Sequence, residues 1–389
     1  MGRALWLGHP FFIGIGVVAF MLMITCFHNT TRSTRETPRK RAPSKVECPI
    51  LGKPSPPVGL PEQYEVNGHR CRPKYNMGFL KTHRCGSSSI QNILFRFAAR
   101  HEIFLVLPAS GEYISTEPFR VEDVCLVPSY RIGYNMLNLH TRWNHAEVRR
   151  ILPKDTVYFS VLRDPVGQFL SMFRYLEMDR FVTIEAFASG EIPEQRLSGF
   201  FGRNQMLWDF GLSAEELTDE RRIRQKIIEI ERDFDLLLIA DRMDESLVLL
   251  RELLCWPPLY MVSMRLNSLM ASSELPAGQD TRTRLATWLK GDYMLYNHFY
   301  QRFEERVQRF GVNNMRKEVK KLQDETMDWV NMCKITRNGP WELPPPNRWS
   351  SERVYGFVAQ NQSTDCKTLV MSEQQWVKLL RSEMAQFVP

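Results

Sequence analysis

Residues 79–89 read Phe79-Leu80-Lys81-Thr82-His83-Arg84-Cys85-Gly86-Ser87-Ser88-Ser89. The apolar run Met77–Leu80 predicts a short strand, and apolar residues at helical spacing predict a helix from Ser88 to Arg100. The small and hydroxyl residues between these elements predict a tight loop. A strand–loop–helix junction directs backbone N–H groups and the helix dipole at one point, so the sequence predicts an anion site there.

The loop differs from the Walker phosphate loop in the order of its residues. Its cations, Lys81 and Arg84, and its histidine, His83, precede the small residues. The pattern Gly-x-x-x-x-Gly-Lys-Ser/Thr places the lysine after them instead. Taken alone, the stretch is equally consistent with an ordinary turn whose charges are solvated, so a second element is needed to separate the two interpretations.

A second strand–helix junction follows later in the chain. Alternating apolar residues predict a strand from Thr156 to Leu162, and Asp164-Pro165 is a typical helix start. Arg163 at the end of the strand and Ser171, roughly two turns into the helix, can hold one phosphate together, the arginine through its bidentate fork. The alternative is an Arg–Asp pair beside a capped helix.

The rest of the chain alternates strand-like and helix-like segments. Strands are expected at Ile103–Leu107 and Phe234–Ala240, a helix at Asp244–Leu254, and mostly helical structure at Thr281–Trp329. This alternation predicts an α/β fold with a central parallel sheet flanked by helices.

Composition narrows the function classes. The net charge of +7 is spread diffusely, and no zinc-finger or RNA-binding signature accompanies it, so no nucleic-acid partner is expected. The 8 cysteines include no Cys-x-x-Cys pair, which argues against a structural zinc site. In an oxidising compartment several of them could pair, although the sequence leaves the pairing open.

The N-terminal segment is apolar from Leu5 to Phe27. Four segments are expected: a tail (1–10), a transmembrane signal-anchor (11–27), a stem rich in Pro, Arg and Ser (28–62) and a folded domain (63–389). The alternative for the apolar run is a cleaved signal peptide. No Ala-x-Ala-like site follows the run, which favours the transmembrane helix.

The two junctions together resemble the donor-binding elements of sulfotransferases, and most closely those of the galactose-3-O-sulfotransferase family. The resemblance extends from about Pro73 to Phe310, and within the family the chain is most similar to the second member, which acts on glycoprotein glycans. One departure is Arg84, where family members often carry a second lysine. The most specific stretches are residues 79–83, Gln91–Phe97, Ser160–Pro165, Asp209-Phe210-Gly211 and Asp244–Leu247.

The resemblance implies a P-loop-like sulfotransferase fold, 3′-phosphoadenosine 5′-phosphosulfate (PAPS) as sulfate donor and a terminal β-galactose as acceptor. Lys81 is then expected to stabilise charge on the leaving phosphate, and His83 to accept the proton of the acceptor hydroxyl. The alternative for His83 is a phosphate-binding or helix-capping role. This chemistry requires no metal. The donor-binding residues are expected to be Lys81, Thr82, Arg84, Cys85, Gly86, Ser87, Ser88, Ser89, Arg163 and Ser171.

A polar cluster at residues 140–145 is a candidate for the acceptor site. Trp143 is expected to stack on the apolar face of a sugar, and His140 to bond its hydroxyls, with Arg142 between them. The alternative is a surface turn after a strand.

The resemblance further implies a single-pass type II protein of the Golgi membrane with a luminal domain. Basic residues after the apolar run outnumber the single Arg3 before it, and the positive-inside rule alone predicts the opposite orientation. Asn29 and Asn361 lie in glycosylation sequons. Asn29 is so close to the expected membrane span that its modification is doubtful.

Two other functions remain open. A Golgi glycosyltransferase using a nucleotide sugar shares the anchored layout and often needs Asp-x-Asp to hold a metal. Asp233-Phe234-Asp235 has this pattern, although its place before an apolar run predicts that it ends a helix and opens a strand. A non-catalytic carbohydrate-binding membrane protein would retain no nucleotide. A nucleoside kinase is disfavoured because the Walker lysine is missing.

Overall fold

The computed structural model describes residues 46–190, 201–339 and 351–388. At its centre lies a four-stranded sheet, and all of its neighbouring strands are parallel. In spatial order the strands are β5 (Met136–Leu137), β3 (Met77–Leu80), β7 (Val157–Leu162) and β8 (Leu236–Ile239). This confirms the prediction of an α/β fold with a central parallel sheet.

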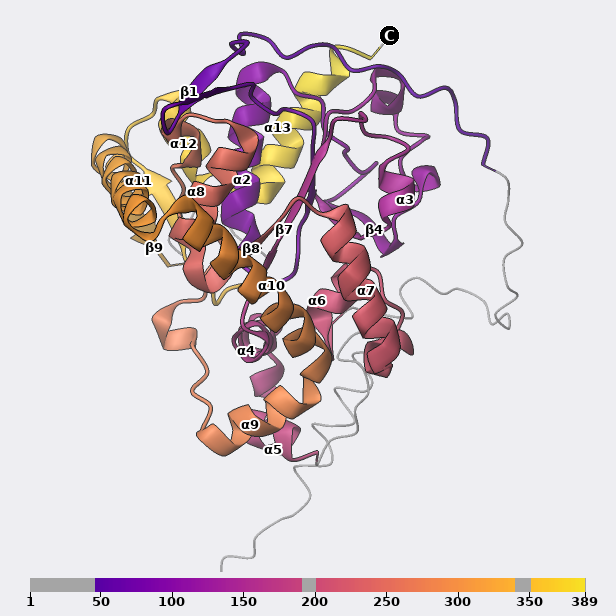
Figure 1. The fold of residues 1–389 in the computed structure, drawn as a ribbon, viewed down its shortest axis with the longest axis vertical. Coiled ribbons are helices and arrows are strands. Elements are labelled where there is room, and N and C mark those ends of the chain that lie inside the picture. The colour runs from indigo at the N-terminus through magenta and orange to yellow at the C-terminus, as the bar shows by residue number, and fades with distance from the viewer. Residues whose placement is uncertain (1–45, 191–200, 340–350, 389) are drawn as a thin grey trace, which may run out of the picture.

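Helices follow the central strands and cover the sheet. Strand β3 leads into α2 (Ser87–His101), β7 into α4 (Pro165–Tyr175) and β8 into α8 (Met243–Leu254). In Figure 1 the sheet lies between α2, α8 and α13 (Glu373–Ala385) on one side and α3 (His145–Val148) and α7 (Glu220–Asp233) on the other. The remaining α-helices are α5 (Ile184–Ser189), α6 (Gln205–Asp209), α9 (Gln279–Trp288), α10 (Lys290–Phe310), α11 (Val312–Cys333) and α12 (Thr364–Val370).

The described residues also form three small two-stranded sheets. Two are antiparallel, and the third is a parallel pair beside the central sheet. Their members are β1 (Tyr64–Val66) with β2 (His69–Cys71), β9 (Ile335–Asn338) with β10 (Gly356–Ala359), and β4 (Tyr113–Pro118) with β6 (His140–Arg142).

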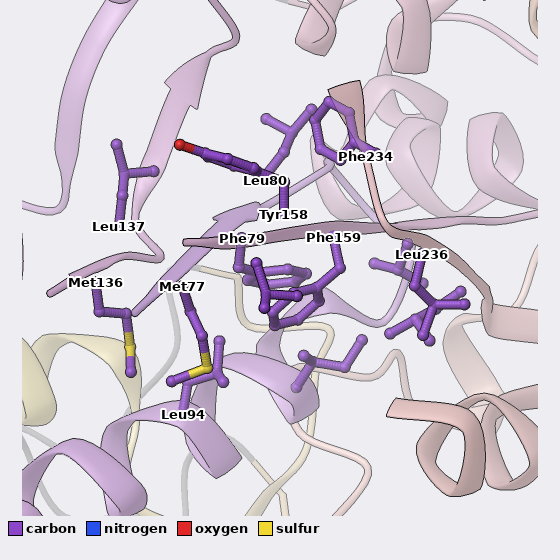
Figure 2. Close-up of a cluster of buried hydrophobic side chains, with 14 of the residues drawn as sticks. Met77, Phe79, Leu80, Leu94, Met136, Leu137, Tyr158, Phe159, Phe234 and Leu236 are labelled. Atoms are coloured by element: carbon purple, nitrogen blue, oxygen red, sulfur yellow. The ribbon is translucent and has the colours of Figure 1, made fainter. Parts of the chain in front are cut away.

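Side chains of β3 and β7 alternate between the two faces of the sheet and form the core there. Phe79 and Phe159 are register partners, and their rings stack at 5.2 Å between centroids on the face that α2 covers (Figure 2). Tyr158 projects to the opposite face. Its register partner is Gly78, where a Cβ atom would lie 2.5 Å from the Tyr158 ring. A glycine is therefore required beside that ring.

One predicted strand is wrong. Residues 103–107 form no strand and share only an isolated bridge, between Leu105 and Met136, with the sheet. The segment is nevertheless buried, since Leu105 and Val106 are fully shielded from solvent. Its apolar character therefore reflects burial rather than strand pairing, two causes that a short apolar run does not distinguish.

Three disulfides join separate segments of the described chain: Cys48–Cys125, Cys71–Cys255 and Cys333–Cys366. Within the expected stem, the Gly52 amide also donates to the Tyr130 carbonyl and the Val58 amide to that of His101. The part of the expected stem from Cys48 to Val58 therefore packs against the folded domain.

No helix among the described residues is long and apolar enough to span a bilayer. The anchor predicted at residues 11–27 lies outside the described residues, as does the sequon at Asn29.

Candidate active site

A cleft of about 1030 Å³ lies at the carboxyl ends of β3 and β7. Its walls come from the loop after β3, from α4 and from residues 263–269. Parallel strands end at one edge of their sheet, which is why the two predicted junctions meet here. The sequence-predicted residues that line the cleft are Lys81, His83, Arg84, Gly86, Ser87, Ser88, Ser89, His140, Arg163 and Ser171.

Internal hydrogen bonds hold the loop between β3 and α2 in shape. The Thr82 hydroxyl donates to the Val161 carbonyl at 2.5 Å, and the Ser87 hydroxyl donates to the Thr82 carbonyl at 2.7 Å. Gly86 precedes α2 with φ of 75°, a left-handed conformation that favours glycine. The loop therefore presents the N-terminus of α2 to the cleft in a fixed orientation.

Arg84, Arg163 and Ser171 lie together in one part of the cleft. The Arg84 Nε donates to the Ser171 hydroxyl at 3.2 Å, and the Arg163 Nη1 donates to the Arg84 carbonyl at 3.1 Å. The Arg84 guanidinium lies 4.2 Å from the centre of the Tyr175 ring, and burial lowers its pKa to about 10.

This arginine pair has no counter-ion within residues 46–190, 201–339 and 351–388. Among the described residues, neither Arg84 nor Arg163 forms an ion pair with a carboxylate. Two partly buried guanidinium groups without compensation form a strong site for an external anion. The predicted partnership of Arg163 and Ser171 thus includes Arg84, the residue that departs from the family pattern.

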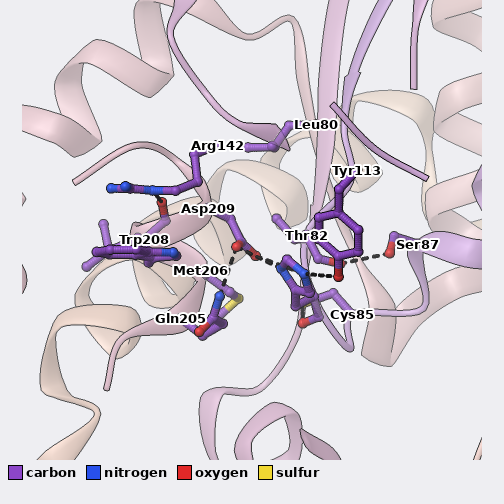
Figure 3. A network of polar contacts seen from close by, with 12 residues as sticks. Leu80, Thr82, Cys85, Ser87, Tyr113, Arg142, Gln205, Met206, Trp208 and Asp209 are labelled. Carbon is purple, nitrogen blue, oxygen red and sulfur yellow. Dashed lines mark hydrogen bonds and ion pairs between the residues drawn. The ribbon is translucent and has the colours of Figure 1, made fainter. Parts of the chain in front are cut away.

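His83 is held by Asp209, the last residue of α6. The Asp209 Oδ1 lies 2.8 Å from the His83 Nδ1, and its Oδ2 accepts a hydrogen bond from the His83 backbone N–H at 2.8 Å. Gln205 also donates to the Asp209 Oδ1, at 2.9 Å (Figure 3). Because a carboxylate only accepts, the Nδ1 of His83 carries the hydrogen and its Nε2 offers a lone pair.

Aromatic side chains surround the Nε2 nitrogen of His83. The Tyr113 hydroxyl lies 3.2 Å from the His83 Nε2, and the His140 ring stacks on the His83 ring with centroids 4.5 Å apart. Phe201 approaches edge-on, at 5.1 Å between centroids. Burial lowers the pKa of His140 well below its usual value, and the nearby positive charge of Lys81 adds to this. His140 is therefore neutral at physiological pH.

Lys81 is almost completely buried, with 2% of its surface exposed. Its ammonium pairs with the carboxylate of Glu373, the first residue of α13. Burial lowers the pKa of Lys81, whereas the Glu373 carboxylate acts in the opposite direction. The predicted leaving-group lysine therefore has a carboxylate partner inside the protein, which the arginine pair lacks.

Four predicted site residues do not reach the cleft with their side chains. Thr82 and Cys85 are turned into the protein, and burial raises the pKa of the Cys85 thiol. Arg142 donates to the backbone carbonyls of Trp208 and Leu212, which makes it a structural residue. Trp143 is 5% exposed and packs on Phe234 with ring centroids 5.0 Å apart, so it is unable to stack on a sugar.

The sequence did not assign roles to Asp209, Tyr113, Phe201 or Glu373. Asp209 belongs to the stretch Asp209-Phe210-Gly211, which resembles the family, and this resemblance was the one signal in the sequence that pointed to Asp209. Glu373 lies 292 residues from Lys81 along the chain, so no local pattern connects them. Within the described residues, no three His, Cys, Asp or Glu side chains are grouped so as to hold a metal ion.

Known proteins are similar to this chain over about two thirds of its length or more. The family model for galactose-3-O-sulfotransferase matches residues 13–339. Galactose-3-O-sulfotransferase 2 from Homo sapiens is 34% identical over 273 residues, which cover 67% of this chain and 68% of that protein. Galactosylceramide sulfotransferase from Homo sapiens is 32% identical over 295 residues, covering 72% and 69%. The chain, with its phosphate-type loop, arginine pair and aspartate-bound histidine in one cleft, belongs to the galactose-3-O-sulfotransferase family.

Proposed function

We propose that this protein transfers a sulfuryl group from PAPS to the 3-hydroxyl of a terminal β-galactose on a glycan. The observation that carries the proposal is the pairing of Asp209 with His83 in the same cleft as Lys81 and the arginine pair. Membership of the family supports the same reaction.

The donor requires sites for two anionic groups, and the cleft offers both. Arg84, Arg163 and Ser171 are suited to the 3′-phosphate, because two guanidinium groups and a hydroxyl converge there without a carboxylate. The loop before α2, with Ser87 and Ser88, is suited to the phosphosulfate through its backbone N–H groups and the helix dipole. We therefore assign donor binding to these side chains, and to Thr82, Cys85 and Gly86 only through the backbone of the loop.

In the proposed reaction, the acceptor oxygen forms a bond to sulfur while the bond from sulfur to the bridging oxygen breaks. His83 accepts the acceptor proton at Nε2, and Asp209 stabilises the resulting imidazolium through Nδ1–H. The bridging oxygen leaves with the adenosine 3′,5′-bisphosphate product, and the Lys81 ammonium stabilises the charge that develops there. The protein thus needs to move only one proton.

The acceptor galactose is assigned to the side of His83 formed by Tyr113, His140 and Phe201. These rings lie within 6.1 Å of the His83 ring, centroid to centroid, and aromatic faces bind the apolar face of a sugar. Relatives are named for galactose and for galactosylceramide. Both glycoprotein glycans and glycolipids therefore fall within the proposed acceptor class, with glycoprotein glycans favoured by the resemblance to the second member.

We further propose that the protein is a type II Golgi membrane protein with an anchor at residues 11–27 and a luminal domain. The three disulfides favour an oxidising compartment over the cytosol. The stem then extends from residue 28 to about residue 47, since Cys48 is already tied to the domain. Asn361 is the candidate glycosylation site within the described residues, and its side chain is partly exposed.

The glycosyltransferase alternative loses its candidate metal motif. Asp233 is the last residue of α7, and the Asp235 carboxylate accepts a hydrogen bond from the Tyr158 backbone N–H at 2.8 Å. As the sequence predicted, this motif ends a helix and opens a strand.

The deciding experiment is the transfer of labelled sulfate from PAPS to a panel of β-galactosides that includes glycolipid and glycoprotein acceptors. Product is expected with terminal galactose and not with 3-O-methylgalactose. Replacing His83 by Ala should abolish transfer and leave binding of adenosine 3′,5′-bisphosphate nearly unchanged, whereas replacing the exposed His69 should change neither. Transfer from a nucleotide sugar, or loss of bisphosphate binding together with transfer in the His83→Ala variant, would contradict these assignments.

A further inference from the structure

The C-terminal helix α13 supplies a carboxylate partner to Lys81, a residue that lines the cleft, from outside the region that the family model matches. The match ends at residue 339, whereas Glu373 opens α13 and pairs with Lys81. The region matched by the family model therefore does not include Glu373. Its partner is the lysine to which the proposed function gives the leaving group.

The position of Glu373 is fixed by several contacts. The Gln91 side chain, on α2, donates to its Oε1 at 2.8 Å, while Lys81 contacts the other oxygen. Ser372 and Gln375 form a reciprocal cap at the start of α13, and Trp376 stacks on Phe95 of α2 at 5.6 Å between centroids. A carboxylate in the first turn of a helix is also stabilised by the helix dipole.

We propose that Glu373 is a positioning residue, which holds the Lys81 ammonium in the orientation that meets the bridging oxygen of the sulfuryl donor. This inference rests on the proposed function. An ammonium group has three N–H donors, so Lys81 can keep its bond to Glu373 and still direct the others at an anion in the cleft. Without the carboxylate, the buried ammonium loses both its restraint and its counter-charge.

The charges around Lys81 determine how its ionisation responds. Glu373 on α13 and Glu112 before β4 favour the ammonium, whereas Arg84 in the loop disfavours it. His83 in the same loop and His140 on β6 also lie close to it. Burial already lowers the pKa of Lys81. Removing the negative charge of Glu373 lowers it further, so Lys81 should lose its proton at a lower pH.

The test compares Glu373→Gln with Glu383→Gln in the full-length chain. Glu383 lies near the other end of the same helix, away from the cleft, and serves as the matched control. Affinity for adenosine 3′,5′-bisphosphate is measured by calorimetry from pH 6 to 10, and kcat is measured with PAPS and a β-galactoside. Glu373→Gln is expected to move the alkaline loss of affinity about one to two pH units lower. It should also lower kcat at pH 7 at least roughly 10-fold. The control should change neither.

Two outcomes would overturn the proposal. If Glu373→Gln binds the bisphosphate more tightly at every pH and turns over as fast as the wild type, Glu373 blocks the donor rather than positioning Lys81. If it instead removes the acid limb of the kcat profile, Glu373 is a proton acceptor. Should Glu373→Gln fail to fold, Glu373→Asp tests the same contact. In Glu373→Asp, the affinity for the bisphosphate should be lost near the same alkaline pH as in the wild type, while kcat falls. A loss of affinity at a pH about one to two units lower, as expected for Glu373→Gln, would count against the proposal.

Failure of the proposed function gives a different result. A wild-type protein that binds the bisphosphate but sulfates no galactoside would refute the acceptor assignment. The pH dependence of bisphosphate affinity would still report on Glu373 and Lys81, since the leaving 5′-phosphate is present in that ligand.

Discussion

The contact between Asp209 and His83 leads to a specific prediction for the Asp209→Asn variant. Asparagine has nearly the same shape, but only one of its two terminal atoms accepts a hydrogen bond. In the native protein the two carboxylate oxygens accept from the His83 backbone N–H and from Nδ1–H, both at 2.8 Å. If the oxygen of the asparagine side chain keeps the hydrogen bond from the His83 backbone N–H, the NH2 group of the asparagine faces the His83 Nδ1. The imidazole then places its hydrogen on Nε2, where it is unable to accept the acceptor proton.

The magnitude follows from the two roles of Asp209. General-base catalysis by a positioned side chain contributes about 10²–10⁴-fold, and the wrong tautomer forfeits most of it. The expected fall in kcat is therefore about 10²–10⁴-fold, equivalent to about 3–5 kcal/mol at roughly 1.4 kcal/mol per decade. Donor affinity should change less than about threefold, since Arg84, Arg163 and Ser171 contact neither Asp209 nor the His83 ring.

The assay measures initial rates of sulfate transfer at saturating donor, together with calorimetric binding of adenosine 3′,5′-bisphosphate. Asp155→Asn is the matched control, because its exposed carboxylate accepts from the Asn76 side chain at 2.9 Å and lies outside the cleft. The double variant Asp209→Asn/His83→Ala should be no slower than His83→Ala alone, because the two residues act as a unit. A kcat for Asp209→Asn within fivefold of the wild type, with His83→Ala inactive, would refute the reasoning.

Three further predictions test other parts of the site and the core. Replacing Arg163 by Ala removes one of the two guanidinium groups that have no carboxylate partner among the described residues. In steady-state assays the donor KM should rise about 10–100-fold, and kcat should change less than fivefold. A fall in kcat alone would contradict this prediction. Replacing Gly78 by Ala places a Cβ 2.5 Å from the Tyr158 ring, and urea unfolding should show a loss of about 1–3 kcal/mol, whereas an unchanged midpoint would mean that the ring moves freely. Burial raises the pKa of Asp292 to about 7, so the folded state binds a proton that the unfolded state has lost, and this contribution to stability falls as pH rises from about 4 to 7. The stability of Asp292→Asn relative to the wild type should therefore improve by about 2–3 kcal/mol between pH 5 and pH 7 in urea titrations, and a constant difference would exclude a raised pKa.

The local parts of the site could be predicted from sequence because each lies at a strand–helix junction. The alternating residues before Arg163 and the Asp164-Pro165 start gave β7 and α4, and the Asp164 side chain accepts from the Gly167 amide at 2.7 Å as a helix cap should. The parallel sheet then brings Lys81 and Arg163 to one edge without further information.

Parts of the site formed by distant segments could not be predicted in this way. Asp209 reaches His83 across 126 residues, and Glu373 reaches Lys81 across 292. Around residue 140, the polar cluster in the sequence did not predict which side chains reach the cleft. His140 lies beside His83, whereas Arg142 and Trp143, two and three residues later, are buried in the core. Alternation places His140 and Arg142 on the same side of β6, so it does not explain their different surroundings. Arg142 instead bonds the carbonyls of Trp208 and Leu212, which lie far along the chain and leave no local signal in the sequence.

Lys81 has a carboxylate partner among the described residues, whereas Arg84 and Arg163 have none, and we propose that this difference gives them different roles in the reaction. The phosphate at the arginine pair carries the same charge before, during and after transfer. Guanidinium groups without a carboxylate therefore bind ground state and transition state alike, which sets KM rather than kcat. The bridging oxygen gains charge only as its bond to sulfur breaks. A buried ammonium already balanced by Glu373 attracts the resting donor less strongly and still supplies an N–H as that charge appears. Substitutions at the arginine pair should therefore act mainly on donor affinity, and substitutions at Lys81 or Glu373 mainly on turnover.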